Sequence, residues 1–592
     1  MSAKPAHNPA GKFSAVRQVP AVIGVKATPL GDSASPDALK RLNAAMADLK
    51  AQAVEPYLYQ ALIDVRAERH VEGAQWALKA LEINERCGLG WHLLAICREK
   101  AGDYTNSLKC YEKALELDPN NAEIAINLGR LAYQMDMKDV AEKLFAHYLV
   151  HFPGSPEGVN NLACAMRDQM KFDEAIEILQ TVIMANQDNA LLWNTLATVL
   201  NERGDVEQAM IFFDEALRLD PAFAKARYNR GNNRLQMGDP RGGLIDVEEA
   251  LSQAVLESEV VMMKLARSTM LVSAGELGDG WDAYEIRLDP NYAETTHFLI
   301  DRPKWEPDTD LAGKHILVMG EQGLGDEVLF ANVLADVVEA IGPDGHLTIA
   351  VEPRLVPLFQ RSFPKATVGP HSTYRVDHYT VRVAAFVKDM ETIDVWTPMA
   401  SLLRRFRRSV DAYPKTRGFL KADPARVKYW RKTLKALGPG PNVGVVWKSL
   451  VIDSGRQRYF SPFEQWQPIL STPGVRFVNL QYGDCEAELA AAKAAGIEIW
   501  NPPGIDLKND LDDVAALSVA LDLVIGPANA ATNIAAACGT LMWLISIPGA
   551  WPRLGQAQFP WYPQVRVFQP RTYNAWTPVM TEIGEALAAE SF

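Results

Sequence analysis

The hydrophobic and polar positions between residues 54 and 257 repeat with a period of 34. Small residues occupy one repeat position six times, and a second small residue follows each of them twelve positions later. Small residues let two helices cross closely, so this pattern predicts six pairs of antiparallel helices. The first series is Ala61, Ala95, Gly129, Ala163, Ala197 and Gly231, and the second is Gly73, Ser107, Ala141, Ala175, Ala209 and Gly243.

After residue 310 the pattern changes to short apolar runs that alternate with helical segments. Such alternation is typical of parallel sheets covered by helices on both faces, and the break at 413–424 divides the region into two units. The predicted strands are 315–319, 346–351, 442–447, 475–480, 497–500, 521–525 and 541–547. The predicted helices are 327–341, 426–437, 487–495, 511–520 and 528–538.

A glycine-rich turn connects the first of these strands to its helix. Gly323 and Gly325 lie in the turn, and Asp326 and Glu327 end it. Glycines let backbone N–H groups approach a ligand, and the helix N-terminus adds a partial positive charge. The run lacks the lysine of a P-loop and the full Gly-x-Gly-x-x-Gly fingerprint, which disfavours both of those nucleotide sites. The turn therefore predicts either a phosphate site of another kind or a tight turn with no ligand.

Two resemblances give these patterns a family context. The repeats, with Trp91, Trp193 and endings such as 113–119, resemble the tetratricopeptide repeat, whose stacked helix pairs usually bind a peptide. Six runs in the region after them resemble a second family; they are 280–287, 321–326, 420–426, 444–447, 521–525 and 561–563. That family is bacterial and fuses such repeats to a heptosyltransferase-like GT-B glycosyltransferase unit. Some members of that group transfer a sialic-acid-like nonulosonic sugar to flagellin.

The predicted fold class is an all-α tetratricopeptide superhelix followed by an α/β GT-B unit of two Rossmann-like domains. The predicted segments are a flexible tail at 1–35, repeats at 36–257, a junction at 258–310, and Rossmann-like domains at 311–425 and 426–592.

The donor half of the resemblance falls on the second Rossmann-like domain. The run after the strand at 521–525 opens a helix, so its backbone and polar side chains are expected to face a nucleotide phosphate. Related sequences often have an aspartate and a histidine where this chain has Ala528 and Asn533. The predicted donor-binding residues are Gly323, Gly325, Lys448, Arg456, Gln481, Gly526, Asn529, Thr532 and Asn533.

Transfer with inversion needs a general base. Asp326 and Glu327 are the candidates, because they end the glycine turn and are expected to face the cleft between the two Rossmann-like domains. Asp326 matches the presumed base of heptosyltransferase-like enzymes; its alternative role is to bond the amides of the turn. No histidine follows His378, which excludes a histidine base in the second domain. No Asp-x-Asp metal signature lies in a suitable loop, so a metal-independent reaction is expected.

Asparagines recur at one position of the repeats, namely Asn127, Asn161 and Asn229, with Thr195 in the fourth slot. A row of carboxamides can pair with successive amides of an extended peptide, which predicts an acceptor-binding ladder. Asparagine is also a common consensus residue of this repeat, and the alternative is that these side chains bond only neighbouring helices.

The net charge of -13 argues against general nucleic-acid binding. The six cysteines lie apart without a Cys-x-x-Cys pair, which fits a reducing cytoplasm. No apolar stretch reaches the length of a membrane span. These features favour a cytoplasmic protein. The resemblance implies a protein O-glycosyltransferase without a cofactor, with a CMP-linked nonulosonic acid as donor and flagellin as partner. The alternatives are an O-GlcNAc-transferase-like enzyme that uses UDP-N-acetylglucosamine, and a non-catalytic adaptor.

Overall fold

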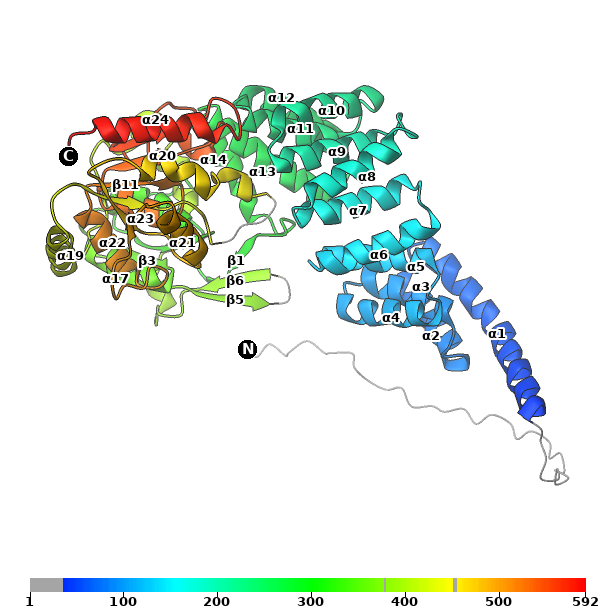
Figure 1. Cartoon of the computed structure of the whole chain (residues 1–592). Helices are drawn as coiled ribbons and strands as arrows, with labels where there is room; N and C mark the ends of the chain where they lie inside the picture. Colours follow the sequence, from blue (N-terminus) through cyan, green and yellow to red (C-terminus); the bar gives the residue numbers. More distant parts are fainter. Residues whose placement is uncertain (1–35, 377–378, 451–454) are drawn as a thin grey trace, which may run out of the picture. The chain divides into compact units, whose positions relative to one another are not determined.

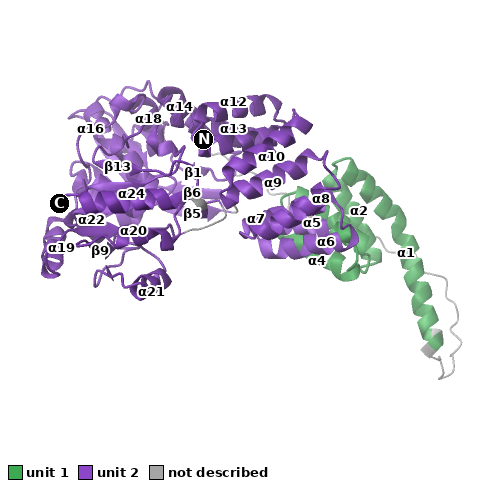
Figure 2. Cartoon of the chain, turned by 45° about the horizontal axis from the view of Figure 1, so that its top comes forward, with its two compact units in different colours: residues 1–124 green, residues 125–592 purple. Residues whose placement is uncertain are grey.

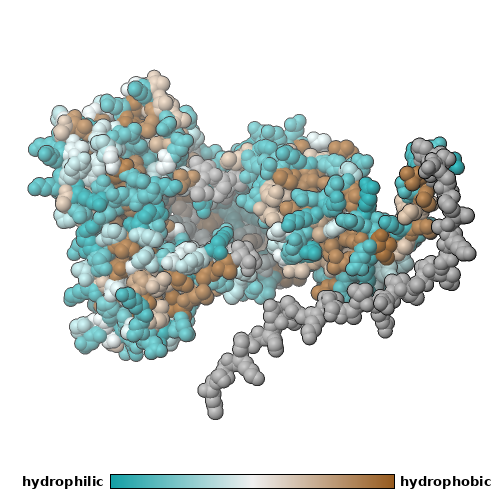
Figure 3. All heavy atoms as spheres, turned by 90° about the horizontal axis from the view of Figure 1, so that it is seen from below, coloured by the Kyte–Doolittle hydropathy of each residue, from teal (hydrophilic) through white to brown (hydrophobic). Residues whose placement is uncertain are grey.

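The computed structural model describes residues 36–376, 379–450 and 455–592, so the predicted tail at 1–35 lies outside it. The chain divides into two compact units, residues 1–124 and 125–592, which Figure 2 colours separately. In the described part of the chain no helix is long and apolar enough to cross a membrane. Hydrophilic and hydrophobic residues are interspersed over the face shown in Figure 3.

Helices alone form the described chain up to Tyr284, apart from their connections. They are α1 (Pro36–Arg66), α2 (His70–Ile83), α3 (Gly88–Lys100), α4 (Tyr104–Leu117), α5 (Ala122–Gln134), α6 (Lys138–His151), α7 (Pro156–Asp168), α8 (Phe172–Ile183), α9 (Ala190–Arg203), α10 (Val206–Leu219), α11 (Ala224–Gln236), α12 (Pro240–Gln253), α13 (Glu257–Ser273) and α14 (Leu277–Tyr284).

The two series of small residues meet inside the helix pairs, as the repeat predicts. The Ser107 hydroxyl on α4 donates to the carbonyl oxygen of Ala95 on α3 at 2.8 Å. On α12, a Cβ atom at Gly243 would lie only 2.7 Å from the carbonyl oxygen of Gly231 on α11. A larger residue at either position would force the paired helices apart. The repeat pattern thus predicted the helix pairs correctly.

The helical array continues beyond the predicted end of the repeats at residue 257. Helices α13 and α14 pack as a further antiparallel pair, with Gly280 against Val272. Trp281 is buried, and its ring packs edge-on against Trp551 and Trp561 at centroid distances of 6.2 Å. The predicted packing of the junction aromatics against the following region is confirmed.

Three sheets follow the helices (Figure 1). The first is parallel, in the order β4-β3-β2-β7, and the second is parallel, in the order β10-β9-β8-β11-β12-β13; a third, mixed sheet has the order β1-β6-β5. The strands are β1 (Thr296–Phe298), β2 (His315–Met319), β3 (His346–Val351), β4 (Thr367–Pro370), β5 (Ser372–Val376), β6 (Tyr379–Val383), β7 (Val395–Pro398), β8 (Asn442–Val445), β9 (Arg476–Asn479), β10 (Ile499–Trp500), β11 (Leu523–Pro527), β12 (Met542–Ile545) and β13 (Val565–Phe568).

The helices around these sheets are α15 (Leu324–Phe330), α16 (Leu334–Ile341), α17 (Val356–Ser362), α18 (Leu403–Phe406), α19 (Pro424–Ala436), α20 (Gln467–Leu470), α21 (Glu486–Ala494), α22 (Leu511–Ala520), α23 (Ala530–Ala537) and α24 (Trp576–Ala589). In the second sheet Val443 and Val445 pack with α20 and α24, whereas Val478 and Val524 pack with α19, α22 and α23. Helices therefore cover both faces, as predicted for a parallel sheet.

Candidate functional site

Both parallel sheets reverse their strand order at a point that faces the same cavity. In chain order the second sheet reads 3-2-1-4-5-6, the order of a doubly wound nucleotide-binding sheet, with its switch between β8 and β11. The first sheet switches between β2 and β7. Such sheets bind ligands beyond the carboxyl ends of the strands at the switch. Here β2 leads through the glycine turn into α15, and β11 leads into α23.

The two loops meet. The Asn533 side chain on α23 donates from Nδ2 to the carbonyl oxygen of Gly325 on α15, at 3.3 Å. A cavity of about 570 Å³ opens beside this contact. It is lined by Gly325, Asp326, Arg456, Asn529 and Asn533 among other residues. Five of the predicted site residues, taken from three separate segments, are thus brought together.

Asp326 takes part in both the turn and the cavity. Its Oδ2 accepts from the backbone N–H of Gly323 at 3.1 Å, so the carboxylate holds the turn as the alternative role required. The same side chain lines the cavity. Burial raises the pKa of Asp326 to about 6, helped by the nearby charges of Glu321 and Glu327, while the Gly323 hydrogen bond and Arg456 oppose this rise. A carboxylate with such a pKa takes up a proton readily near neutral pH.

The opposite wall is the N-terminus of α23. Asn529 caps this helix: its Oδ1 accepts from the Thr532 N–H at 3.1 Å, and the Thr532 hydroxyl accepts from the Asn529 N–H at 2.9 Å. The Asn529 Nδ2 is buried and has no hydrogen-bond partner within the described residues. A helix N-terminus with a further unsatisfied N–H donor suits an anionic group.

The prediction that Glu327 faces the cleft is wrong. Glu327 is 1% exposed, and it accepts from the backbone N–H of Glu352 at 2.8 Å. Its other oxygen lies 2.8 Å from His371 Nε2 and 3.3 Å from Arg382 Nη1. The helix turns the side chain after Asp326 inward, so Glu327 fixes α15 to β6 and the loop after β3, away from the cavity.

Five predicted donor-binding residues do not line the cavity. The first, Gly323, donates its backbone N–H to Asp326 within the glycine turn. The Lys448 ammonium pairs with Glu488. Gln481 is buried, and its Oε1 accepts from the N–H groups of Trp447 and Lys448 at 3.0 Å each. Thr532 is fully buried as part of the α23 cap, and Gly526 lies inside β11, where a Cβ atom would be 2.7 Å from the carbonyl oxygen of Val446. These five residues shape the loops of the site.

A buried ion pair that sequence reasoning missed supports the glycine turn. Arg287, which follows α14, donates from Nε and Nη2 to the Glu321 carboxylate at 2.8 and 2.9 Å. Glu321 also accepts from the backbone N–H of Ala400 at 2.6 Å. Ion pairs of Glu285 with Arg287 and Lys304 outweigh burial and lower the pKa of Glu285 to about 2. The feature of the sequence that could have pointed to this ion pair is the Glu-x-Arg motif of the junction, which contains Arg287.

The turn itself holds a strained residue. Gln322 has φ of +58°, a left-handed conformation that non-glycine residues rarely adopt. Arg382 on β6 donates to the carbonyl oxygens of Gly320 and Gln322 at 2.7 and 2.8 Å. The Gln322 side chain donates to the Tyr284 hydroxyl. Surrounding contacts therefore fix this conformation, as is common at functional sites.

The carboxamides of the repeats bond one another across neighbouring helices. Asn229 donates to Asn194 Oδ1 at 2.9 Å, and the Thr195 hydroxyl donates to Asn160 Oδ1 at 2.6 Å. Asn161 accepts from Asn160 at 3.1 Å. Asn127 also has a partner. The alternative role in joining helices is thus present for Asn229, whereas the bond between Asn160 and Asn161 stays within α7. Acceptor binding by the row of Asn127, Asn161 and Asn229 stays a prediction.

The fold and this site define a tetratricopeptide-repeat protein with an appended region of two parallel sheets. A family model described as "TPR repeat" matches residues 100–136, and one described as "Tetratricopeptide repeat" matches residues 166–230. Protein FlbA of Caulobacter vibrioides is 48% identical over 564 residues, which cover 95% of this chain and 94% of that protein. The chain therefore belongs to the family of Protein FlbA.

Other relatives match a smaller part of the chain. Cellulose synthase operon protein C of Pseudomonas fluorescens is 24% identical over 36% of this chain and 16% of that protein. Among solved structures, YrrB, titled "a TPR protein with an unusual peptide-binding site", is 20% identical. The match covers 32% of this chain and 98% of the YrrB chain, with a TM-score of 0.25.

Proposed function

We propose that the protein is a metal-independent O-glycosyltransferase of GT-B type that modifies Ser or Thr of a protein bound by its repeats. One observation carries the proposal: a single cavity lies at the switch points of both parallel sheets, with Asp326 on one wall and the N-terminus of α23 on the other. The favoured acceptor is flagellin, and the favoured donor is a CMP-linked nonulosonic acid. The choice of this acceptor and of this donor follows from the resemblance of the sequence motifs to those of the flagellin glycosyltransferases.

In this reaction the acceptor hydroxyl oxygen attacks the anomeric carbon of the donor sugar. The bond between that carbon and the phosphate oxygen breaks, and the nucleotide leaves with the electron pair. Asp326 takes the hydroxyl proton. The N-terminus of α23, Asn529 Nδ2 and Arg456 stabilise the charge that grows on the phosphate.

The nucleotide is expected to stabilise the protein against heat. A ligand at 100 times its Kd adds about 2.7 kcal/mol to the free energy of unfolding of the part that binds it. We expect CMP to raise Tm in a thermal-shift assay more than UDP, GDP or ADP at the same concentration. A larger shift with UDP would favour the O-GlcNAc-transferase-like alternative, and no shift with any nucleotide would favour the non-catalytic adaptor.

Turnover is expected to rise as pH increases through about 6. Asp326 acts as a base only when ionised, and its pKa is raised to about 6 because the carboxyl group is buried. A plot of kcat/KM against pH reports the pKa of the free enzyme, so its acidic limb should have a midpoint near pH 6. A rate that is constant between pH 5 and 7 would contradict this assignment.

A further inference from the structure

A second cavity adjoins the site and is built partly from the repeats. It has a volume of about 650 Å³ and lies between helices α9, α11 and α13 on one side and the loops after β11 and β12 on the other. Six residues line both this cavity and the one beside Asp326: Tyr459, Phe460, Ala528, Trp551, Pro552 and Phe559. The two cavities therefore adjoin at a shared boundary that includes four aromatic side chains.

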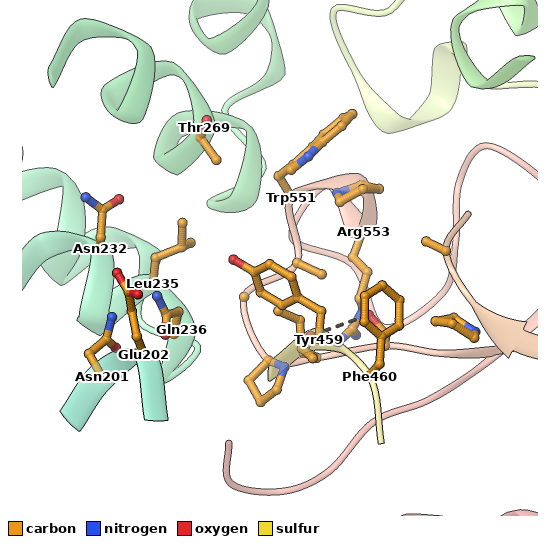
Figure 4. A pocket seen from close by; sticks show the side chains of 18 of the residues that line it. Asn201, Glu202, Asn232, Leu235, Gln236, Thr269, Tyr459, Phe460, Trp551 and Arg553 are labelled. Atoms are coloured by element: carbon orange, nitrogen blue, oxygen red, sulfur yellow. Dashed lines mark hydrogen bonds between the residues drawn. The ribbon is translucent and has the colours of Figure 1, made fainter. Parts of the chain in front are cut away.

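The wall made by the repeats is polar. Asn229, Asn232 and Gln236 follow one another at spacings of three and four residues, so they share one face of α11, and all three line the cavity. In Figure 4 the side chains of Asn232, Leu235 and Gln236 lie opposite Tyr459, whose hydroxyl points toward them. Gly549, at φ of +68°, lets the facing loop approach the last turn of α11.

This wall holds an unsatisfied hydrogen-bond acceptor. Gln236 is only 8% exposed, and its Oε1 has no hydrogen-bond partner within the described residues. One carboxylate oxygen of Glu202 on α9 is also buried without a hydrogen-bond partner within the described residues, and the other lies 3.5 Å from Arg167 Nε. A buried acceptor without a donor costs free energy. Both oxygens suit a ligand that brings N–H groups.

The cavity is nearly neutral. Its charged lining residues among those described are Glu202 and Arg553, and Arg553 already donates to Gln569 and to the carbonyl oxygen of Gln556. A volume of about 650 Å³ fits a short segment of chain but no folded domain. The occupant that matches these features is an extended, uncharged polypeptide segment, whose backbone N–H groups meet the carboxamide face of α11.

We infer that this second cavity is the entry channel for the acceptor, through which a neutral, extended Ser- or Thr-containing segment reaches Asp326 past Tyr459 and Trp551. The inference rests on the proposed function and adds the residues that select the acceptor. It gives the repeats a direct part in catalysis, because α11 positions the segment that reacts. Gln236 and Asn232 act as specificity residues, and they contact no part of the donor.

The test is steady-state kinetics of the full chain with flagellin as acceptor and a CMP-linked nonulosonic acid as donor. Gln236→Met keeps the size of the side chain but removes the acceptor oxygen. We expect KM for flagellin to rise about five- to tenfold, the effect of one lost hydrogen bond, with the Kd for CMP unchanged. Asn232→Ala is a second, less buried variant and should act in the same direction.

Gln187→Met is the matched control, because Gln187 is exposed on the repeats and lies outside both cavities. It should leave KM for flagellin unchanged. Sugar transfer with an unchanged flagellin KM in both Gln236→Met and Asn232→Ala would overturn the inference and leave the proposed function standing. A weaker CMP affinity in Gln236→Met would also overturn it, since the cavity would then belong to the donor. A wild-type protein that binds CMP and flagellin but transfers nothing would overturn both.

Discussion

Replacing Asp326 with Asn is expected to lower kcat for sugar transfer by about 10²- to 10⁴-fold, the usual contribution of a general base. The carboxamide keeps the size of the side chain, and its oxygen can still accept the hydrogen bond from Gly323 that the carboxylate accepts at 3.1 Å. It cannot take up the acceptor proton. Affinity for CMP, measured by calorimetry, and Tm are therefore expected to change little while kcat falls.

Glu327→Gln is the matched control for this variant, because Glu327 is adjacent in the chain but buried away from the cavity. It should lower stability through its lost interactions with His371 and Arg382. If Asp326 served only the turn, Asp326→Asn would lower Tm and CMP affinity together and affect kcat less. Full turnover by purified Asp326→Asn would rule out its role as the base.

Replacing Arg287 with Met is expected to lower the free energy of unfolding of the sheet region by about 3–5 kcal/mol. The Arg287 guanidinium donates two hydrogen bonds to the Glu321 carboxylate, and Glu321 is only 2% exposed. Without the arginine a charge stays buried and unpaired. Chemical denaturation followed by tryptophan fluorescence measures the loss, since Trp281 and Trp305 are buried in the same core.

Arg241→Met is the control, because the Arg241 side chain is 73% exposed and its contact with Glu276 is long, at 3.6 Å. Its effect should stay within about 0.5 kcal/mol. The double variant Arg287→Met/Glu321→Gln should recover part of the loss, because it removes the unpaired charge. A loss below about 1 kcal/mol in Arg287→Met would show that the pair does not hold the turn.

Local patterns predicted much of the fold. The small residues of the repeats were readable because helices cross at a fixed interval, and β2, β3 and α22 have the predicted bounds. The strands that were not predicted from the sequence are short, with three to five residues each. Val395–Pro398 and Val565–Phe568 are examples: each extends a sheet whose other strands are already present, so pairing with a neighbour, and not a local pattern, makes them strands.

The site was predictable only where its signal is local. Glycines before a helix marked the turn at Asp326, and Asn529 and Asn533 stood out at the start of α23. The role of Lys448 could not be read, because its partner Glu488 lies forty residues away in the chain. Arg382 likewise bonds Gly320 from a strand that follows it by 62 residues. Contacts of this kind depend on the tertiary fold.

The most direct measurement is the intact mass of flagellin after incubation with the full-length protein, a CMP-linked nonulosonic acid and EDTA. If Asp326 and the N-terminus of α23 carry out metal-independent transfer, flagellin should gain the mass of one or more sugar residues while CMP is released. Asp326→Asn should lose this gain at equal protein concentration and time. An unchanged flagellin mass with the wild-type protein, under conditions where it binds both CMP and flagellin, would contradict the account.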